Sequence, residues 1–139
     1  MEARIKHLEF IQAAIARMAN HSFLLKGWSV TIVGGLLALS LKEWSIAYIF
    51  ISIVVLLFFW LLDSYYLSRE RLFVKLYNHV RKQKPRAVDF SMDTRMFENG
   101  CEWHGSARST TMVLFYGGLF FVHLIMIHVL YMYGTKSIL

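Results

Sequence analysis

The sequence has few of the residues that cross-link or break a chain: its 139 residues include one cysteine, Cys101, and one proline, Pro85. A single cysteine excludes an intramolecular disulfide and gives no indication of an oxidising compartment. The single proline leaves the long apolar stretches without an internal helix breaker. Internal repeats and low-complexity tracts are also missing from the sequence. A disulfide-stabilised scaffold and a repeat architecture are therefore both excluded.

Charge is scarce as well, because charged residues make up 17% of the chain and hydrophobic residues 57%. Soluble domains are about 45–50% apolar and about 25% charged. A membrane-spanning helix needs roughly 20 predominantly apolar residues to cross about 30 Å of hydrocarbon. Three stretches meet this need, the first of them with Lys26 reaching to the interface; they are 23–41, 44–62 and 110–133. We predict an all-α integral membrane protein with three transmembrane helices.

The positive charges are distributed unevenly around these three stretches. Lysine and arginine gather in cytoplasmic loops close to membrane spans, and this bias sets orientation. The hairpin between the first two spans holds only Lys42, and the end of the chain holds only Lys136. The other lysines and arginines lie at or before the start of the first span, where Lys26 is the last of them, or in 63–109. We therefore expect a bacterial inner-membrane location, with a cytoplasmic N-terminus and a periplasmic C-terminus.

The segments outside the predicted spans differ in pattern. Residues 2–22 have apolar side chains at spacings of three and four, which predicts an amphipathic helix. Residues 63–84 continue a helical pattern directly from the second span, with no breaker before Pro85, which predicts a long cytoplasmic extension of that helix. Residues 85–109 are rich in turn formers and predict a compact cytoplasmic loop. The whole chain, 1–139, is expected to form a single membrane domain.

Two neighbouring faces of the first span have different compositions. One face collects small residues, which allow close backbone approach and tight helix association in a membrane. We predict an oligomer or partner contact there; its members are Gly27, Thr31 and Gly34, with Gly35 and Ala38 beside them. The other face is the most polar line on any span, and it includes Lys26, Ser29, Val33 and Ser40. These four residues are candidates for lining a pore, although such serines can equally hydrogen-bond within their own helix or to a neighbour.

The extension after the second span has an apolar face and a basic end. An apolar face outside lipid needs a partner: the N-terminal helix, the same tract of another subunit, or the membrane surface. We predict an oligomer or partner contact there, formed by Tyr66, Phe73, Leu76 and Val80. The basic end fits the positive-inside pattern and predicts contact with lipid headgroups. It comprises Arg81, Lys82, Lys84 and Arg86, and nearby acidic residues argue against specific nucleic-acid binding.

His123 lies near the middle of the third span, where a polar side chain is costly and by default suggests a function. It is a candidate for a protonatable gate in a pathway. It is equally suited to an interhelical hydrogen bond with Thr31 or Ser52, which is typically worth about 0.6 to 2 kcal/mol in membranes.

Catalytic and metal-binding patterns are weak. Cys101 and His104 are suitable zinc ligands by type, but a closed structural site needs about four ligands, and only His79, Glu98 and Glu102 are near them in sequence. A nucleophilic cysteine would need a base and an orienting group. We therefore expect no enzyme activity, no metal and no cofactor; a membrane enzyme would have to depend on Cys101, His104 or His123.

The first 80 or so residues carry a further pattern. An amphipathic helix containing RM-N-SFLLKGW is followed by a short hairpin and by an aromatic-rich span ending in FW-LD-YYL-RERLF-KLY. This order resembles the SLATT class of small bacterial membrane effectors that accompany antiviral systems. The residues that carry the resemblance are Arg17, Met18, Ser22 to Trp28, Trp60, Asp63, Tyr65, Tyr66 and Arg69 to Tyr77. The resemblance implies an oligomeric effector that permeabilises the inner membrane when a partner detects infection.

Two functions follow from these observations. The first is an oligomeric effector that forms a pore or perturbs the membrane in anti-phage defence, triggered by a separate soluble sensor. The second is a non-conducting membrane anchor or regulatory subunit that recruits a soluble partner through its cytoplasmic helix. The lipid bilayer is a partner in both, and a homo-oligomer is expected for the first.

Overall fold

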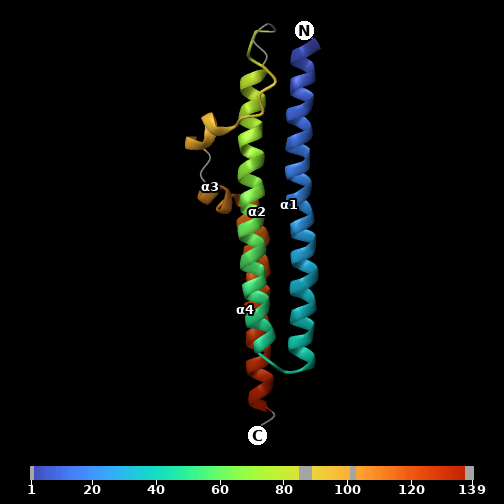
Figure 1. Cartoon of the computed structure of the whole chain (residues 1–139). Coiled ribbons are helices and arrows are strands. Elements are labelled where there is room, and N and C mark those ends of the chain that lie inside the picture. Colours follow the sequence, from blue (N-terminus) through green and yellow to red (C-terminus); the bar gives the residue numbers. More distant parts are fainter. Residues whose placement is uncertain (1, 85–88, 101–102, 137–139) are drawn as a thin grey trace.

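The computed structural model describes residues 2–84, 89–100 and 103–136, and these form helices and short connections without a strand. The main elements are α1 (Glu2–Lys42), α2 (Ala47–Val80) and α4 (Thr110–Lys136). Two short helices, η2 (Arg95–Gly100) and α3 (Trp103–Ala107), connect α2 to α4. Helices α1 and α2 form an antiparallel hairpin, and α4 lies along one half of it (Figure 1). The described ends of the chain lie at opposite ends of the molecule (Figure 1).

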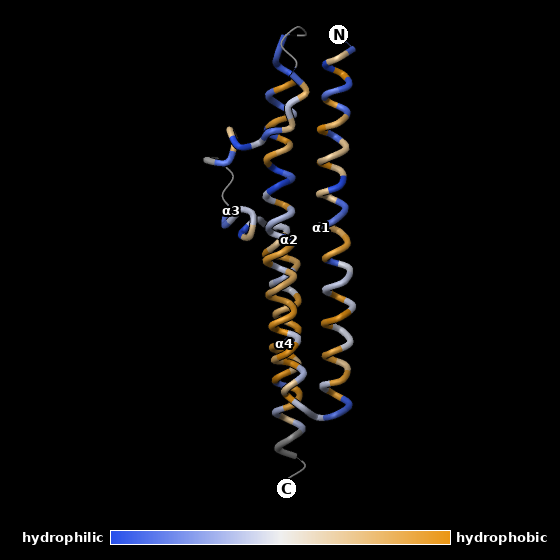
Figure 2. Tube along the Cα trace, in the orientation of Figure 1, coloured by the Kyte–Doolittle hydropathy of each residue, from blue (hydrophilic) through white to orange (hydrophobic). Residues whose placement is uncertain are grey.

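The predicted membrane character is confirmed, because all three main helices are long and apolar enough to cross a membrane. The spans lie within Glu2–Lys42, Ala47–Val80 and Thr110–Tyr133. Apolar residues dominate the half of the molecule that contains the α1–α2 turn and α4, whereas the other half alternates between polar and apolar residues (Figure 2). Large apolar side chains are strongly exposed in the apolar half, for example Phe23 at 73% and Leu114 at 71%. Such exposure suits contact with lipid.

The helix boundaries differ from the predicted segments in two places. Residues 2–22 and 23–41 are not separate elements but one continuous helix, since no proline or turn former interrupts them. Residues 44–62 and 63–84 form the one continuous helix that the sequence predicts, but this helix begins at Ala47, later than the predicted start, and ends at Val80. Trp44 has a φ of 48°, a left-handed conformation that belongs to a turn and not to the start of a helix. The chain reverses there through a hydrogen bond of 3.2 Å from the Ser45 amide to the Ser40 carbonyl.

Two apolar clusters hold the hairpin together. The cluster in the apolar half joins α1, α2 and α4, and its buried members are Val33, Leu37, Ile49, Leu56, Met112, Tyr116 and Leu130. The cluster in the polar half joins the start of α1 to the end of α2, through Ile11, Leu76 and Val80. Phe97 from η2 also packs against this second cluster. The polar half is therefore a two-helix stalk, which we define as residues 2–22 of α1 and 63–80 of α2.

Candidate functional site

The hairpin brings two opposite charges to the same level. Its turn is centred between Trp44 and Ser45, so residues whose numbers sum to about 89 face one another across it. Lys26 on α1 and Asp63 on α2 satisfy this relation. Lys26 follows the stalk segment of α1 by four residues, and Asp63 is the first residue of the stalk on α2. The fold of the hairpin alone therefore places an ammonium group beside a carboxylate.

Asp63 is the centre of a buried polar cluster. Its side chain has no exposure to solvent, and that of Lys26 is 18% exposed. Lys26 Nζ donates to Asp63 Oδ2 at 2.5 Å, and Ser22 Oγ donates to Asp63 Oδ1 at 2.5 Å. Lys26 Nζ also lies 2.8 Å from Ser22 Oγ, which accepts that hydrogen bond. Two residues one helical turn apart on α1 therefore hold both oxygens of one carboxylate on α2.

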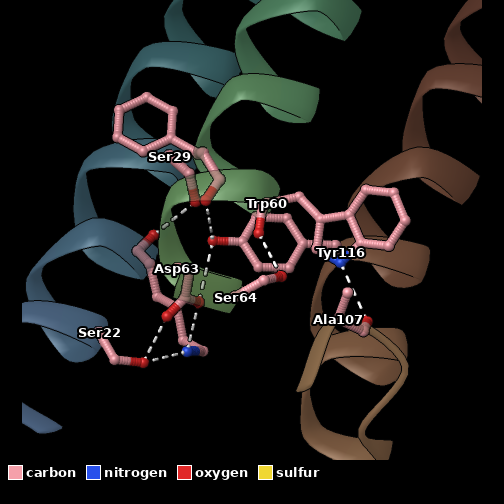
Figure 3. Close-up of polar contacts among 9 residues, drawn as sticks. Ser22, Ser29, Trp60, Asp63, Ser64, Ala107 and Tyr116 are labelled. Carbon is pink, nitrogen blue, oxygen red and sulfur yellow. Dashed lines mark hydrogen bonds and ion pairs between the residues drawn. The ribbon is translucent and has the colours of Figure 1, made fainter. Parts of the chain in front are cut away.

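The third helix also contributes to the cluster. The Tyr116 hydroxyl, from α4, donates to Asp63 Oδ2 at 3.1 Å. Figure 3 shows this hydroxyl pointing from α4 toward Asp63, with Ser22 approaching from α1 on the other side of the carboxylate. Asp63 is thus the point at which α1, α2 and α4 are joined by polar contacts. We call Ser22, Lys26, Asp63 and Tyr116 the Asp63 cluster.

The electrostatics of the Asp63 cluster favour a structural role for its charges. Taking an ion pair out of water costs several kcal/mol per ion, and their attraction offsets this cost only when the remaining hydrogen-bonding capacity is satisfied. The Asp63 carboxylate accepts three hydrogen bonds, one of them from an ammonium group, so this condition is met.

Below the Asp63 cluster, toward the α1–α2 turn, a second polar contact links α2 to α4. His123 is fully buried, and its Nε2 lies 2.8 Å from Ser52 Oγ. This is one of the two interhelical partners predicted for His123, so that interpretation is confirmed. The other ring nitrogen, Nδ1, donates to the Leu119 carbonyl oxygen at 2.8 Å, because that oxygen can only accept. Both ring nitrogens are therefore engaged inside the bundle.

The other pore-lining candidates lie inside the bundle too. Ser29, Val33 and Ser40 are buried on the face of α1 that packs against the other helices. Ser29 Oγ donates to the Lys26 carbonyl oxygen at 2.8 Å, within its own helix. Ser40 Oγ is buried without a hydrogen-bond partner in the described part of the chain. The polar line predicted on α1 is thus the packing face of that helix in the single chain.

The two sets of predicted contact residues have different surroundings. Gly27, Thr31 and Gly34 are exposed, and a Cβ atom built on either glycine meets no atom within 4 Å. Leu76 and Val80 are buried, and Tyr66 and Phe73 are partly buried. The N-terminal half of α1 packs against Phe73, Leu76 and Val80 through Ile11, Leu8 and Ile15, so this part of the face is covered within the single chain.

The remaining candidates are at the far end of the stalk or beyond the described residues. Arg81, Lys82 and Lys84 are exposed, as contact with headgroups requires. Arg86 and Cys101 lie outside the described residues. Within the part of the chain that the structure describes, no group of three His, Cys, Asp or Glu side chains could hold a metal ion.

Sequence reasoning missed Asp63 as a site residue, although the signal was present. It is the first charged residue after the uncharged stretch of α2, and Lys26 stands near the beginning of the apolar stretch of α1. In an antiparallel hairpin these two positions are adjacent, so opposite charges there predict an ion pair. Comparison with known proteins adds nothing to this picture, because no family model, curated protein or solved structure matches the chain.

Proposed function

We propose that this protein is an oligomeric membrane effector that forms a pore or perturbs the bacterial inner membrane. The proposal is carried by the exposed small-residue face of α1, formed by Gly27, Thr31, Gly34, Gly35 and Ala38. Helices associate in lipid by close backbone approach, and glycines without neighbouring atoms permit that approach. Because the single chain leaves this face uncovered, a second copy of the chain is the natural partner.

A conducting path in such an assembly would run between copies. The polar side chains of the spans mostly face the interior of the bundle, where the Asp63 cluster and the His123 contact engage them. The outer surfaces are largely apolar, so the path between copies would be closed at rest by a hydrophobic constriction that excludes water. Opening it requires a rearrangement, which suits an effector that acts only when triggered.

The role in anti-phage defence rests on the resemblance of residues 1–80 to SLATT effectors. The stalk supports a triggered mechanism, because it extends a polar helical hairpin away from the apolar half (Figure 2). The lysines and arginines concentrate at that end of the molecule, so we place the stalk and the N-terminus in the cytoplasm and the C-terminus in the periplasm. A separate soluble sensor would contact the stalk there.

The test combines assembly with permeability. Gly34→Leu places a bulky side chain on the small-residue face, and Gly118→Leu makes the same change at an exposed position of α4; neither Cβ meets an atom within 4 Å in the single chain. We expect the Gly34 variant, but not the Gly118 variant, to lose the oligomer seen by cross-linking in membranes. We also expect induced expression of the unaltered protein to depolarise the inner membrane, and the Gly34 variant to lose this effect. An unchanged oligomer, or depolarisation by both variants alike, would disprove the proposal.

A second function, a non-conducting anchor that recruits a soluble partner, is favoured by a different observation. The polar groups of the spans are largely satisfied inside one chain, so little remains on the outer faces to line a path for ions. The two functions differ in conductance. Protein in liposomes that never releases a small trapped dye, even with the activating sensor present, would favour the anchor.

A further inference from the structure

A groove of about 380 Å³ opens between α2 and α4 on the outer surface of the apolar half. Leu56 and Trp60 line it from α2, and Met112, Val113, Tyr116 and Gly117 line it from α4. Its two polar side-chain groups are already engaged: the Tyr116 hydroxyl donates to Asp63, and Trp60 Nε1 donates to the Ala107 carbonyl oxygen at 3.2 Å. The groove is therefore an apolar surface that faces the lipid.

The shape of the groove depends on Gly117. A Cβ atom built there meets no atom within 4 Å, so a larger side chain fits without moving the backbone. Such a side chain would occupy the groove itself. Gly118, the next residue, is equally free of neighbours but does not line the groove.

Two arginines belong to the segment at one end of the groove. The bond from Trp60 to Ala107 fixes α3 there, and Arg108 follows Ala107 directly. Arg108 is exposed, and within the described residues no hydrogen bond or ion pair of its side chain is found. The Arg71 side chain also contacts α3: its Nη1 donates to the Gly105 carbonyl oxygen at 3.3 Å and to Ser106 Oγ at 3.2 Å.

We propose that this groove binds one anionic phospholipid, with an acyl chain along Leu56, Val113 and Gly117 and the phosphate beside Arg108. An apolar groove in the span, with exposed Arg108 directly after the residue that Trp60 contacts, matches the two parts of such a lipid. A second copy of the chain fits less well, because its own acidic residue at this depth, Asp63, is buried and paired with Lys26. This site is separate from the small-residue face of α1 and does not depend on the proposed pore.

The primary test is native mass spectrometry of protein extracted from membranes that contain phosphatidylglycerol and phosphatidylethanolamine. We expect one retained phosphatidylglycerol per chain in the unaltered protein and in Gly118→Leu, and none in Gly117→Leu. One arginine near a membrane surface favours an anionic lipid by about fivefold, so Arg108→Gln should reduce the preference by that factor. Equal retention by the two glycine variants would overturn the proposal. So would loss of an oligomer in Gly117→Leu alone, which would identify a second copy as the occupant.

A second measurement does not depend on the folding of the Gly117 variant. Trp60 lines the groove, and replacing Trp28, Trp44 and Trp103 by Phe leaves it as the single tryptophan. In vesicles we expect brominated phosphatidylglycerol to quench Trp60 fluorescence more strongly than brominated phosphatidylethanolamine at equal mole fraction. Arg108→Gln should remove this difference. Equal quenching by the two lipids in the protein with Arg108 would contradict the proposal.

Discussion

The Asp63 carboxylate on α2 is buried, and side chains from two other helices, α1 and α4, donate hydrogen bonds to it. The energetics of such a group are asymmetric. Removing one partner of a buried ion pair leaves an uncompensated charge and typically costs about 3–5 kcal/mol, whereas replacing both partners by apolar groups is often neutral. Lys26 is the only cation that contacts this carboxylate in the described residues. Removal of the Lys26 charge would therefore leave the buried Asp63 carboxylate without a cation from the described residues.

Lys26→Met keeps the length of the side chain and removes its charge. We expect it to lower the free energy of unfolding in detergent by about 3–5 kcal/mol, because Asp63 keeps its burial and loses its cation. The double variant Lys26→Met with Asp63→Leu should recover most of this loss. Exposed Lys6, which forms a surface ion pair with Glu9, provides the matched control: Lys6→Met should change stability by less than about 1 kcal/mol. A double variant no more stable than Lys26→Met would argue against the ion pair as the cause.

At the scale of the element, α1 joins two environments without a break. Its 41 residues at 1.5 Å each give a length of about 60 Å, twice the thickness of the hydrocarbon core. One half packs in the apolar half of the molecule and the other in the stalk, through separate clusters. A rigid helix of this kind carries a displacement of the stalk into the span. Continuity near Ala19 therefore joins the two halves through α1, in addition to the unbroken α2.

Ala19→Pro tests that continuity at an exposed position of α1. Proline removes one hydrogen bond of the helix and clashes with the preceding turn, so we expect a loss of about 3 kcal/mol or more in the free energy of unfolding. Ala3→Pro is the control, since an amide in the first helical turn has no partner within the helix. Thermal unfolding followed by circular dichroism compares the two variants. Equal effects would mean that the helix is already interrupted near Ala19 in the membrane.

At the scale of the whole molecule, the sequence predicted the helical class and the three spans, because both depend on composition and length alone. It also offered an interhelical hydrogen bond of His123 to Thr31 or Ser52 as one of two roles, and the structure has the contact with Ser52. It did not identify the Asp63 cluster, which depends on how residues far apart in sequence face one another across the hairpin. For the same reason the polar line on α1 suggested a pore lining, although Ser29 and Ser40 pack inside one chain. The sequence pattern identifies a helix face of unusual composition, whereas the tertiary structure is needed to identify the residues that pack against that face.

The placement of the whole molecule in the membrane gives the last prediction. If the apolar half spans the bilayer and the stalk is cytoplasmic, the α1–α2 turn faces the periplasm. The experiment uses a background in which Cys101 is replaced by serine. We expect Glu43→Cys to react with a membrane-impermeant maleimide in intact cells. Asn78→Cys should react only after the membrane is permeabilised. Both positions are exposed, so burial cannot account for a difference in labelling. The reverse pattern would place the positive stalk outside, against the distribution of lysine and arginine. Labelling of both from the same side would mean that the hairpin does not cross the membrane.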